Sequence, residues 1–578
     1  MLRRIFIKWR RKSARKYNCD IDPDEILLDS SNLSKMDVDQ FEGRIEKPIS
    51  PGSLWTLGIF FSLVLLTFWL RVGFFQVVQG TDYAERSAQN YLRNSFIFAE
   101  RGVISDRTGK QLAWNVVDND SPEFTKRSYL GLNGISSLLG YVKYPMKDKF
   151  GFYFSDELEG KDGVEKYYNN TLAGDKGEKI IEVNALGKVQ TESTVRPAKN
   201  GQNLSLSIDA GLQAKFYDVM AEITNRVSFG GGSALMMDIK TGEIYSMVNF
   251  PEYSSQIMTD GSDSATISAY SKSKMKPFLD RAIFGLYAPG SIVKPFMSLA
   301  GLQEKVIDPN TSIYSSGQLV LPNPYDPSKP SIFKDWKAHG YVNMRQAICV
   351  SSDEYFYRLG GGFEPDHQKG LGIAKIDEYM SKFGFGKQIA DPFFSGPAGT
   401  IPTPEWKAKN FNGDDWRLGN TYHSSIGQYG WSVSPIQALR STAMIAREGT
   451  FIEPTIIKAD ENFKPKVSAD LGIDKSAFKV VKEGMRMVVA DPNLGTAKSL
   501  NIGDSHVAAK TGTAEIDDVK IKVNSWVVGF FPYENPRFAF TLMMEKGPRD
   551  GTVGAVYAMS EVLKWMAVYR PEYFKSQP

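Results

Sequence analysis

A long apolar segment near the N-terminus dominates the pattern of hydrophobic and polar positions. No residue is charged across the 23 positions from Pro48 to Leu70, and the part that reads LWTLGIFFSLVLLTFWL is almost wholly apolar. As a helix these positions span about 35 Å, enough to cross a hydrocarbon core of about 30 Å. Trp55 and Trp69 stand near its two ends, where amphipathic rings favour the membrane interface. The pattern predicts one transmembrane anchor over residues 51–75 rather than a buried core helix.

Short alternating segments follow the anchor. RGVISDRTGKQLAWN at 101–115 predicts two strands joined by a turn at Asp106 to Gly109, and NLSLSID at 203–209 alternates in the same way. Because the chain of 578 residues exceeds the roughly 250–300 residues at which a single core stops growing, we expect several domains. These segments predict a β-rich, membrane-proximal domain over residues 79–225.

The pattern changes near Gly230. GGSALMMDIKTGEIYSMVNF predicts a hairpin that turns at Thr241 and Gly242, and alternating strand and helix patterns then run to the C-terminus. We interpret residues 226–578 as one large α/β domain with an inserted helical part. The whole chain is therefore predicted to be a multidomain α/β protein with a single N-terminal transmembrane helix.

The distribution of charge predicts how the chain is oriented in the membrane. Residues 1–16 hold eight Lys and Arg residues and no acid, so that the remainder of a chain with net charge +3 carries −5. The positive-inside rule then keeps residues 1–50 in the cytoplasm, with 17–47 as a mobile acidic linker, and exports everything after the anchor. No A-x-A-like cleavage site follows the anchor, which favours its retention. A basic excess confined to the tail also argues against nucleic-acid binding.

The candidate chemistry begins at a serine. Ser-x-x-Lys at Ser291 and Lys294 is followed by Pro295, which is tolerated in a first helical turn, so a helix is predicted to begin at or just after Ser291. Such a helix directs the positive end of its dipole at the hydroxyl, and the lysine lies one turn away on the same face. The same spacing at Ser13, Ser271, Ser273, Ser331 and Ser476 lacks this setting.

A lysine that activates a serine must be neutral, and a second cation nearby lowers its pKa. Lys510 offers that cation in AAKTGTAEI, where the small residues predict a strand end and Gly512 would let a substrate backbone approach closely. A second Lys-Thr-Gly at 240–242 fits the predicted hairpin turn and is assigned to structure. Between the two lysines lie Ser351, which could relay protons, and Asp353, which could position lysine or substrate.

None of these motifs identifies a protein family alone, but their combination in this order does. The three are Ser-x-x-Lys at 291, Ser-x-Asp at 351 and Lys-Thr-Gly at 510. On these motifs, together with RAIFGLYAPGSIVKPF, SSIGQYGWSVSPIQ and the pedestal-like NGQNLSLSIDAGLQ, residues 79–578 resemble a class B penicillin-binding protein. KDWKAHG at 334–340 and the acid at 353 are most similar to the elongation-type group, penicillin-binding protein 2. The resemblance implies a dimerisation-type pedestal below a penicillin-binding domain with a helical subdomain.

The resemblance also implies an activity, a D,D-transpeptidase that cross-links peptidoglycan stem peptides during elongation and maintenance of cell shape. Ser291 would attack the D-alanyl-D-alanine carbonyl, Lys294 would take its proton, and Ser351, beside Asp353, would help protonate the leaving D-alanine. Backbone N–H groups of Ser291 and Thr513 would form the oxyanion hole. Substrate binding would fall to Lys510, Thr511, Gly512 and Thr513.

Ligands and partners follow from the same resemblance. β-Lactams would acylate the same serine, a carboxypeptidase side activity would accompany cross-linking, and no cofactor is expected. The implied partners are a membrane-embedded RodA-like glycosyltransferase and cell-shape scaffold proteins, with the catalytic domain on the periplasmic side of the cytoplasmic membrane.

Two details depart from the general family pattern. Asp353 replaces an amide, and a carboxylate accepts hydrogen bonds only, so we expect it to offset the charges of Lys294 and Lys510. Some elongation-type members bind zinc through Asp, His and Cys, which directs attention to Asp335, His339 and Cys349. The position of Cys349 relative to the Ser-x-Asp motif does not match the expected ligand, so we predict no metal site, a structural histidine and a buried cysteine.

Other readings remain open. A non-catalytic scaffold that activates a partner polymerase would share the fold. A division-type transpeptidase usually carries Asn at the position of Asp353, and a β-lactamase would need a deacylating Glu-x-x-Leu-Asn segment, which the sequence lacks. Cys19 and Cys349 fall on opposite sides of the membrane and cannot pair, so packing rather than a disulfide holds the exported part.

Overall fold

A computed structural model describes residues 50–89, 92–118, 123–147, 153–155, 157–183, 189–323, 326, 328–516, 521–549, 551 and 553–575. The predicted cytoplasmic tail, its acidic linker and Cys19 lie outside the described residues. The chain divides into two compact units, one of residues 1–92 with 183–188 and the other of residues 93–182 with 189–578.

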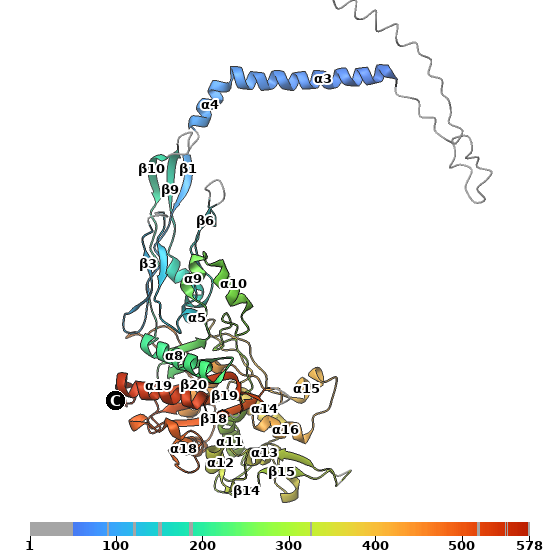
Figure 1. The fold of residues 1–578 in the computed structure, drawn as a ribbon, viewed down its shortest axis with the longest axis vertical. Coiled ribbons are helices and arrows are strands. Elements are labelled where there is room, and N and C mark those ends of the chain that lie inside the picture. The colour runs from blue at the N-terminus through green and yellow to red at the C-terminus, as the bar shows by residue number, and fades with distance from the viewer. Residues whose placement is uncertain are drawn as a thin grey trace, which may run out of the picture. The chain divides into compact units, whose positions relative to one another are not determined.

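The first unit contains the predicted anchor. Helix α3 (Pro51–Gly73) continues into a π-helical turn, η3 (Phe74–Val78), and is followed by α4 (Gly80–Gln89) (Figure 1). Ser50 caps the start of α3 by accepting a hydrogen bond from Ser53 N–H at 3.2 Å, and Pro51 occupies a first-turn position where its missing N–H costs nothing. Within the described residues, 51–78 is the one helical stretch long and apolar enough to cross a membrane, and its side chains are exposed. This fits the predicted span.

The N-terminal part of the second unit is rich in β-structure, as predicted. One sheet has the strand order β1-β9-β10 and another the order β11-β2-β3-β4. The turn at Asp106 to Gly109 is confirmed, since Asp106 Oδ1 accepts from Thr108 N–H at 2.8 Å and Lys110 N–H at 2.9 Å. The bounds are β1 Leu92–Ile97, β2 Ile104–Ser105, β3 Gln111–Val116, β4 Lys126–Tyr129, β9 Gly177–Val183, β10 Val189–Arg196 and β11 Leu204–Ser205, with α6 at Gly163–Tyr167.

A buried ionic group organises this β-rich part. Glu165, on α6, accepts from Arg101 Nε at 2.5 Å and from Arg127 Nε at 2.7 Å, and all three side chains are fully buried. Arg101 also donates to Asn169 Oδ1 at 3.0 Å, and Arg127 donates to Asn115 Oδ1 at 3.1 Å. A buried carboxylate paired with two guanidinium groups is stable only while every partner is present.

A five-stranded antiparallel sheet forms the centre of the α/β domain, with the order β13-β12-β20-β19-β18. The predicted hairpin is confirmed: it joins β12 (Gly231–Asp238) to β13 (Ile244–Phe250), and Gly242, at φ +83°, donates its N–H to Asp238 O at 2.8 Å. The other strands are β18 Ala508–Glu515, β19 Lys522–Phe531 and β20 Phe538–Pro548. Since β12 and β13 are buried along their whole length, both sheet faces are covered.

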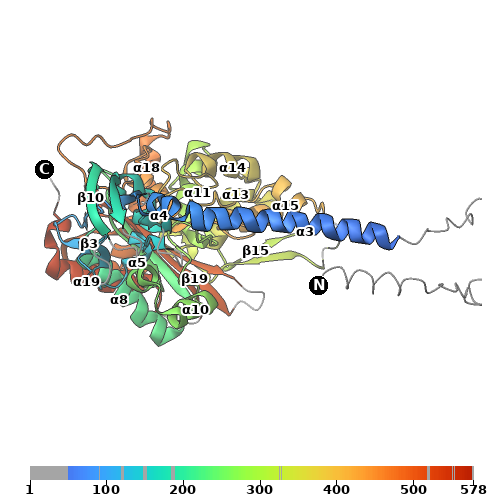
Figure 2. The same ribbon diagram turned by 90° about the horizontal axis from the view of Figure 1, so that it is seen from above.

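Helices from distant parts of the sequence cover the sheet. α8 (Ala210–Val227) and α19 (Ala555–Tyr569) lie side by side against it (Figures 1 and 2), while α17 (Pro435–Ala446) packs on β12, β19 and β20. α18 (Lys475–Ala490) contacts β18, and the inserted helical part joins it through α11, Lys294–Gln303, and α12, Met344–Val350. α13 (Asp353–Gly361) packs against α11 and α16 (Leu418–Ser425). The predicted α/β fold with a helical insert is confirmed, whereas α8, which begins at Ala210, packs on this sheet although it precedes the predicted boundary at residue 226.

Asp209 ties the two ends of this domain together. Its Oδ1 accepts from the N–H groups of Gly211 and Leu212 at 2.9 and 3.1 Å, which caps the start of α8. Its Oδ2 accepts from Arg570 Nε at 2.6 Å and from Tyr573 Oη–H at 2.7 Å, both beyond the end of α19. One buried carboxylate thus serves a helix start and the chain's C-terminal segment.

Glu165→Ala should destabilise the protein by about 3–5 kcal/mol, because it leaves two guanidinium groups buried without their counter-charge. The free energy of unfolding in urea measures the effect. Glu159→Ala is the matched control, since Glu159 pairs with Lys161 at the surface and is about half exposed, where such pairs contribute about 0–1 kcal/mol. Equal losses in the two variants would contradict the structural role of the buried group.

Candidate active site

The predicted nucleophile lies at the start of a helix, as expected. Residues 290–293 form a 3-10 turn, η4, which runs directly into α11 at Lys294. Gly290 precedes the serine with φ +56°, a conformation that favours glycine, and its own N–H donates to Gly427 O at 3.0 Å. Trp526 Nε1–H donates to Ala288 O at 3.1 Å and fixes the approach to the turn. Ser291 itself remains partly exposed and reachable from solvent.

Lys294 reaches the second motif. Its fully buried Nζ donates to Asp353 Oδ1 at 2.6 Å, Ser351 O at 2.7 Å and Ser351 Oγ at 3.3 Å. Among the described residues no hydrogen bond joins Lys294 to the Ser291 hydroxyl, although the two are three positions apart. Catalytic hydrogen bonds are often long in unliganded sites and tighten when substrate binds.

Lys510, on β18, reaches the Ser351 hydroxyl from the sheet. Its Nζ donates to Ser351 Oγ at 2.9 Å and to Thr511 O at 2.8 Å, and the side chain is fully buried. Burial, followed by the positive charge of Lys294, holds the pKa of Lys510 well below its usual value. The structure thereby brings together Ser291, Lys294, Ser351, Asp353 and Lys510 from segments far apart in the sequence.

Asp353 supplies the negative charge of this group. Burial raises the pKa of its carboxyl, and the ammonium of Lys294 opposes that rise. Ser351 owes its position to the break between α12 and α13: it ends α12 at φ +60°, and Ser352 Oγ caps α13 by accepting from Tyr355 N–H at 3.3 Å. The Ser-x-Asp motif is therefore a helix-to-helix junction.

Gly512 is explained differently from the prediction. A Cβ there would lie 2.8 Å from Ile292 Cγ2 and 2.9 Å from Pro289 O, so this chain's own nucleophile turn requires the glycine. The strand also continues through Glu515, which places Lys-Thr-Gly inside β18 rather than at a strand end. Thr513 is exposed on this strand, which is an edge of the sheet.

Two supporting residues escaped the sequence interpretation. The carbonyl oxygen of Gly427, within the motif SSIGQYGWSVSPIQ, accepts a hydrogen bond from Gly290 N–H. The two positions are far apart in the sequence, so only the fold reveals this contact. Asp335 Oδ2 accepts from Ser352 Oγ–H at 2.8 Å and Glu354 N–H at 2.9 Å, and so fixes the start of α13. Burial raises the pKa of Asp335, yet His339, the charge of Lys294 and these hydrogen bonds bring it to about 2.

The positions of Asp335, His339 and Cys349 bear on whether they can bind a zinc ion. Asp335 Oδ1 lies 3.4 Å from His339 Nε2, whereas Cys349 is buried and burial raises the pKa of its thiol to about 12, which opposes the thiolate that a metal needs. In the described part of the chain no group of three His, Cys, Asp or Glu residues is arranged to hold a metal.

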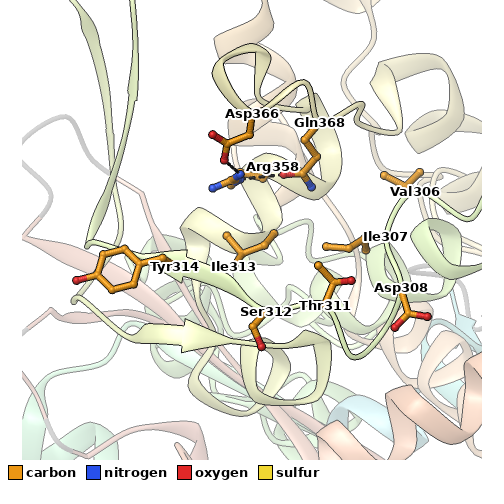
Figure 3. A pocket seen from close by; sticks show the side chains of 10 residues that line it. All are labelled: Val306, Ile307, Asp308, Thr311, Ser312, Ile313, Tyr314, Arg358, Asp366 and Gln368. Carbon is orange, nitrogen blue, oxygen red and sulfur yellow. Dashed lines mark hydrogen bonds and ion pairs between the residues drawn. The ribbon is translucent and has the colours of Figure 1, made fainter.

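A separate pocket of about 500 Å³ opens beyond the far ends of α11 and α13 (Figure 3). Arg358 pairs there with Asp366 and donates from Nε to Gln368 Oε1 at 2.9 Å. None of its lining residues belongs to the predicted site. The predicted site residues therefore gather at the junction of η4, α13 and β18, apart from this pocket.

Purified full-length protein should contain much less than one zinc per chain. The reason is that, among the residues that the structure describes, no three His, Cys, Asp or Glu side chains are arranged to hold a metal. Elemental analysis after dialysis against a weak chelator measures the content. Stoichiometric zinc that is lost in His339→Ala would contradict the prediction.

Comparison with known proteins assigns two family domains to this chain. Residues 232–562 match the family described as penicillin binding protein transpeptidase domain, and residues 122–206 match the penicillin-binding protein dimerisation domain. The chain is 30% identical over 453 residues to peptidoglycan D,D-transpeptidase MrdA of Haemophilus influenzae, covering 73% of this chain and 66% of the relative. It is 26% identical to MrdA of Escherichia coli K12, covering 86% of this chain and 92% of the relative.

A solved structure gives the same assignment. Penicillin-binding protein 2 of Helicobacter pylori, in its complex with MreC, superposes with a TM-score of 0.67 at 25% identity and covers 83% of this chain and 100% of that protein. The transpeptidase family model alone spans more than half of the 578 residues. The resemblance inferred from the sequence motifs is confirmed: this chain belongs to the penicillin-binding proteins, in the elongation-type group of penicillin-binding protein 2.

Proposed function

We propose that this protein is a peptidoglycan D,D-transpeptidase that works through an acyl-enzyme on Ser291. The observation that carries the proposal is the convergence of two fully buried lysines on Ser351 Oγ, at 3.3 Å from Lys294 and 2.9 Å from Lys510, beside a serine at a helix start. The names of its MrdA relatives support the substrate class.

In the acylation step Lys294 acts as the base. Its buried Nζ, held by Ser351 and Asp353, takes the Ser291 proton as Oγ attacks the D-alanyl-D-alanine carbonyl. Ser351 Oγ, between the two lysines, then passes a proton to the leaving D-alanine. Backbone N–H groups of Ser291 and Thr513 stabilise the oxyanion, a role that the close packing of β18 on η4 supports.

The donor peptide binds along β18. As an edge strand it can pair with an extended peptide, and the ammonium of Lys510 with the hydroxyls of Thr511 and Thr513 receives the terminal carboxylate. Gly512 keeps that strand in contact with the nucleophile turn. A β-lactam carries a carboxylate and a reactive carbonyl in a similar arrangement, so it acylates the same serine, and water in place of an acceptor amine gives a carboxypeptidase side reaction.

The anchor and pedestal place this activity at the membrane. α3 spans the cytoplasmic membrane once, with the basic tail inside and the catalytic domain on the periplasmic side. A RodA-like glycosyltransferase in the membrane supplies the glycan strand, and cell-shape scaffold proteins bind the pedestal. The MreC complex of the Helicobacter pylori protein supports the second partner class.

Asp353→Asn should move the pH profile of acylation to lower pH. The carboxylate of Asp353 raises the pKa of Lys510, so its loss lowers that pKa further, and the ammonium that binds the substrate carboxylate then loses its proton at a lower pH. The second-order rate of acylation by penicillin, followed from pH 5 to 10, measures the alkaline limb. Asp504→Asn, at an exposed position, is the control, and an unchanged profile in Asp353→Asn would contradict the role of the carboxylate.

Labelled penicillin should attach to Ser291 of the full-length protein in a 1:1 adduct that persists for many minutes. Peptide mass spectrometry locates the label, and Ser291→Ala, which lacks the nucleophile, should carry none. A folded protein without an adduct would favour the scaffold function. Rapid release of hydrolysed drug would favour a β-lactamase.

A further inference from the structure

The segment from Gly427 to Val433 lies directly against the nucleophile turn. Gly290 N–H donates to Gly427 O at 3.0 Å, and Tyr287 and Val433 exchange both backbone hydrogen bonds, at 3.0 and 2.9 Å. Gly427 has φ +77°, and a Cβ there would lie 2.2 Å from Gly290 O. The backbone of this segment therefore borders the turn that carries Ser291.

Four aromatic rings gather at this segment and form the aromatic cluster. The ring centroid of Tyr429 lies 5.9 Å from that of Trp406, 6.1 Å from Phe411 and 5.8 Å from Trp416, and the Phe411 ring is within 8° of parallel to it. Tyr429 also has φ +65°, an uncommon conformation for a bulky residue and one that persists where the surroundings impose it.

The cluster is not part of the hydrophobic core. None of its four members is buried, none packs against the core of the described chain, and Phe411 is 48% exposed. Core packing therefore does not account for four large rings at one place. Aromatic rings that lie outside the core, around a segment whose backbone contacts the nucleophile turn, are typical of ligand subsites.

Polar contacts hold the loop around the rings in one arrangement. Lys407 is buried, pairs with Asp414 Oδ2 at 2.7 Å and donates to Asn420 Oδ1 at 3.0 Å. Trp416 Nε1–H donates to Thr421 Oγ1 at 2.8 Å. A subsite built on a fixed loop loses little conformational entropy when it binds.

A carboxylate that adjoins one of the rings in the sequence indicates the ligand. Asp415 is exposed, adjoins Trp416 in the sequence, and its carboxylate makes no hydrogen bond or ion pair with any described residue. An ammonium group is attracted both to a carboxylate and to the face of an aromatic ring, while methylene groups pack on the ring faces. The combination suits an alkylamine.

We propose that the aromatic cluster is the subsite for the acceptor amine of transpeptidation, an inference that rests on the proposed function. Its ring faces hold the methylene chain of the acceptor, and Asp415 attracts its ammonium form. After loss of one proton to solvent, the neutral amine forms a C–N bond to the acyl carbon. The C–O bond to Ser291 breaks, and the proton released from the amine returns to Ser291 Oγ.

The test measures how the acyl-enzyme divides between amine and water. Full-length protein in detergent micelles reacts with a short donor peptide ending in D-Ala-D-Ala, in the presence of Nα-acetyl-lysine or of glycine. Trp416→Ala should lower the aminolysis-to-hydrolysis ratio with Nα-acetyl-lysine by about tenfold, equivalent to about 1.4 kcal/mol, and change the ratio with glycine much less. Because both products arise from one acyl-enzyme, partial loss of folded protein does not alter the ratio.

Two further variants complete the test. Trp416→Phe keeps a ring face and should restore most of the ratio, and Tyr569→Ala, which removes a 60% exposed ring on α19, should leave it unchanged. An unchanged ratio in Trp416→Ala, or equal losses with both acceptors, would overturn the acceptor subsite while leaving the acyl-enzyme intact. A wild-type protein that forms no acyl-enzyme would instead overturn the proposed function on which the subsite rests.

Discussion

The site depends on two buried lysines that share one hydroxyl. Lys294 and Lys510 both donate to Ser351 Oγ, and a single carboxylate, Asp353, pairs with one of them. Two like charges in a poorly solvated region repel strongly, so the arrangement survives only if one lysine gives up its proton readily or the surrounding fold holds both in place. The fold holds both lysines in place, because one is anchored on α11 and the other on β18, and the charge of Lys294 adds to the effect of burial in depressing the pKa of Lys510.

Close backbone contact between three segments makes that convergence geometrically feasible. Gly290, Gly427 and Gly512 each stand where a Cβ would lie within 3 Å of neighbouring atoms, so the nucleophile turn, the 427–433 segment and β18 meet without intervening side chains. Lys294 lies at the start of α11, which follows the turn, and Lys510 lies on β18. Glycine in these positions serves assembly of the site, whatever its effect on substrate access.

The sequence could predict the parts of this site but not how they join. The run from Pro48 to Leu70, the hairpin at Thr241 and Gly242, and the helix start at Ser291 are local patterns, and each is found where expected. The motif order suggested that Lys294, Ser351 and Lys510 meet. The hydrogen bond between Gly290 and Gly427, the support of α13 by Asp335 and the reason for Gly512 are long-range contacts, which no local periodicity encodes.

The shared role of Asp209 bears on how the protein matures. This carboxylate caps the first helix of the α/β domain and also binds Arg570 and Tyr573, 361 and 364 positions further along the chain. β12 lies between β13 and β20 in the sheet, so the central sheet likewise needs strands from both ends of the domain. A chain synthesised from its N-terminus therefore presents Ser291 and Lys294 well before the sheet can close. Lys294, Ser351 and Lys510 can meet only after the last strands are in place, which ties the onset of activity to the arrival of the C-terminal part of the chain.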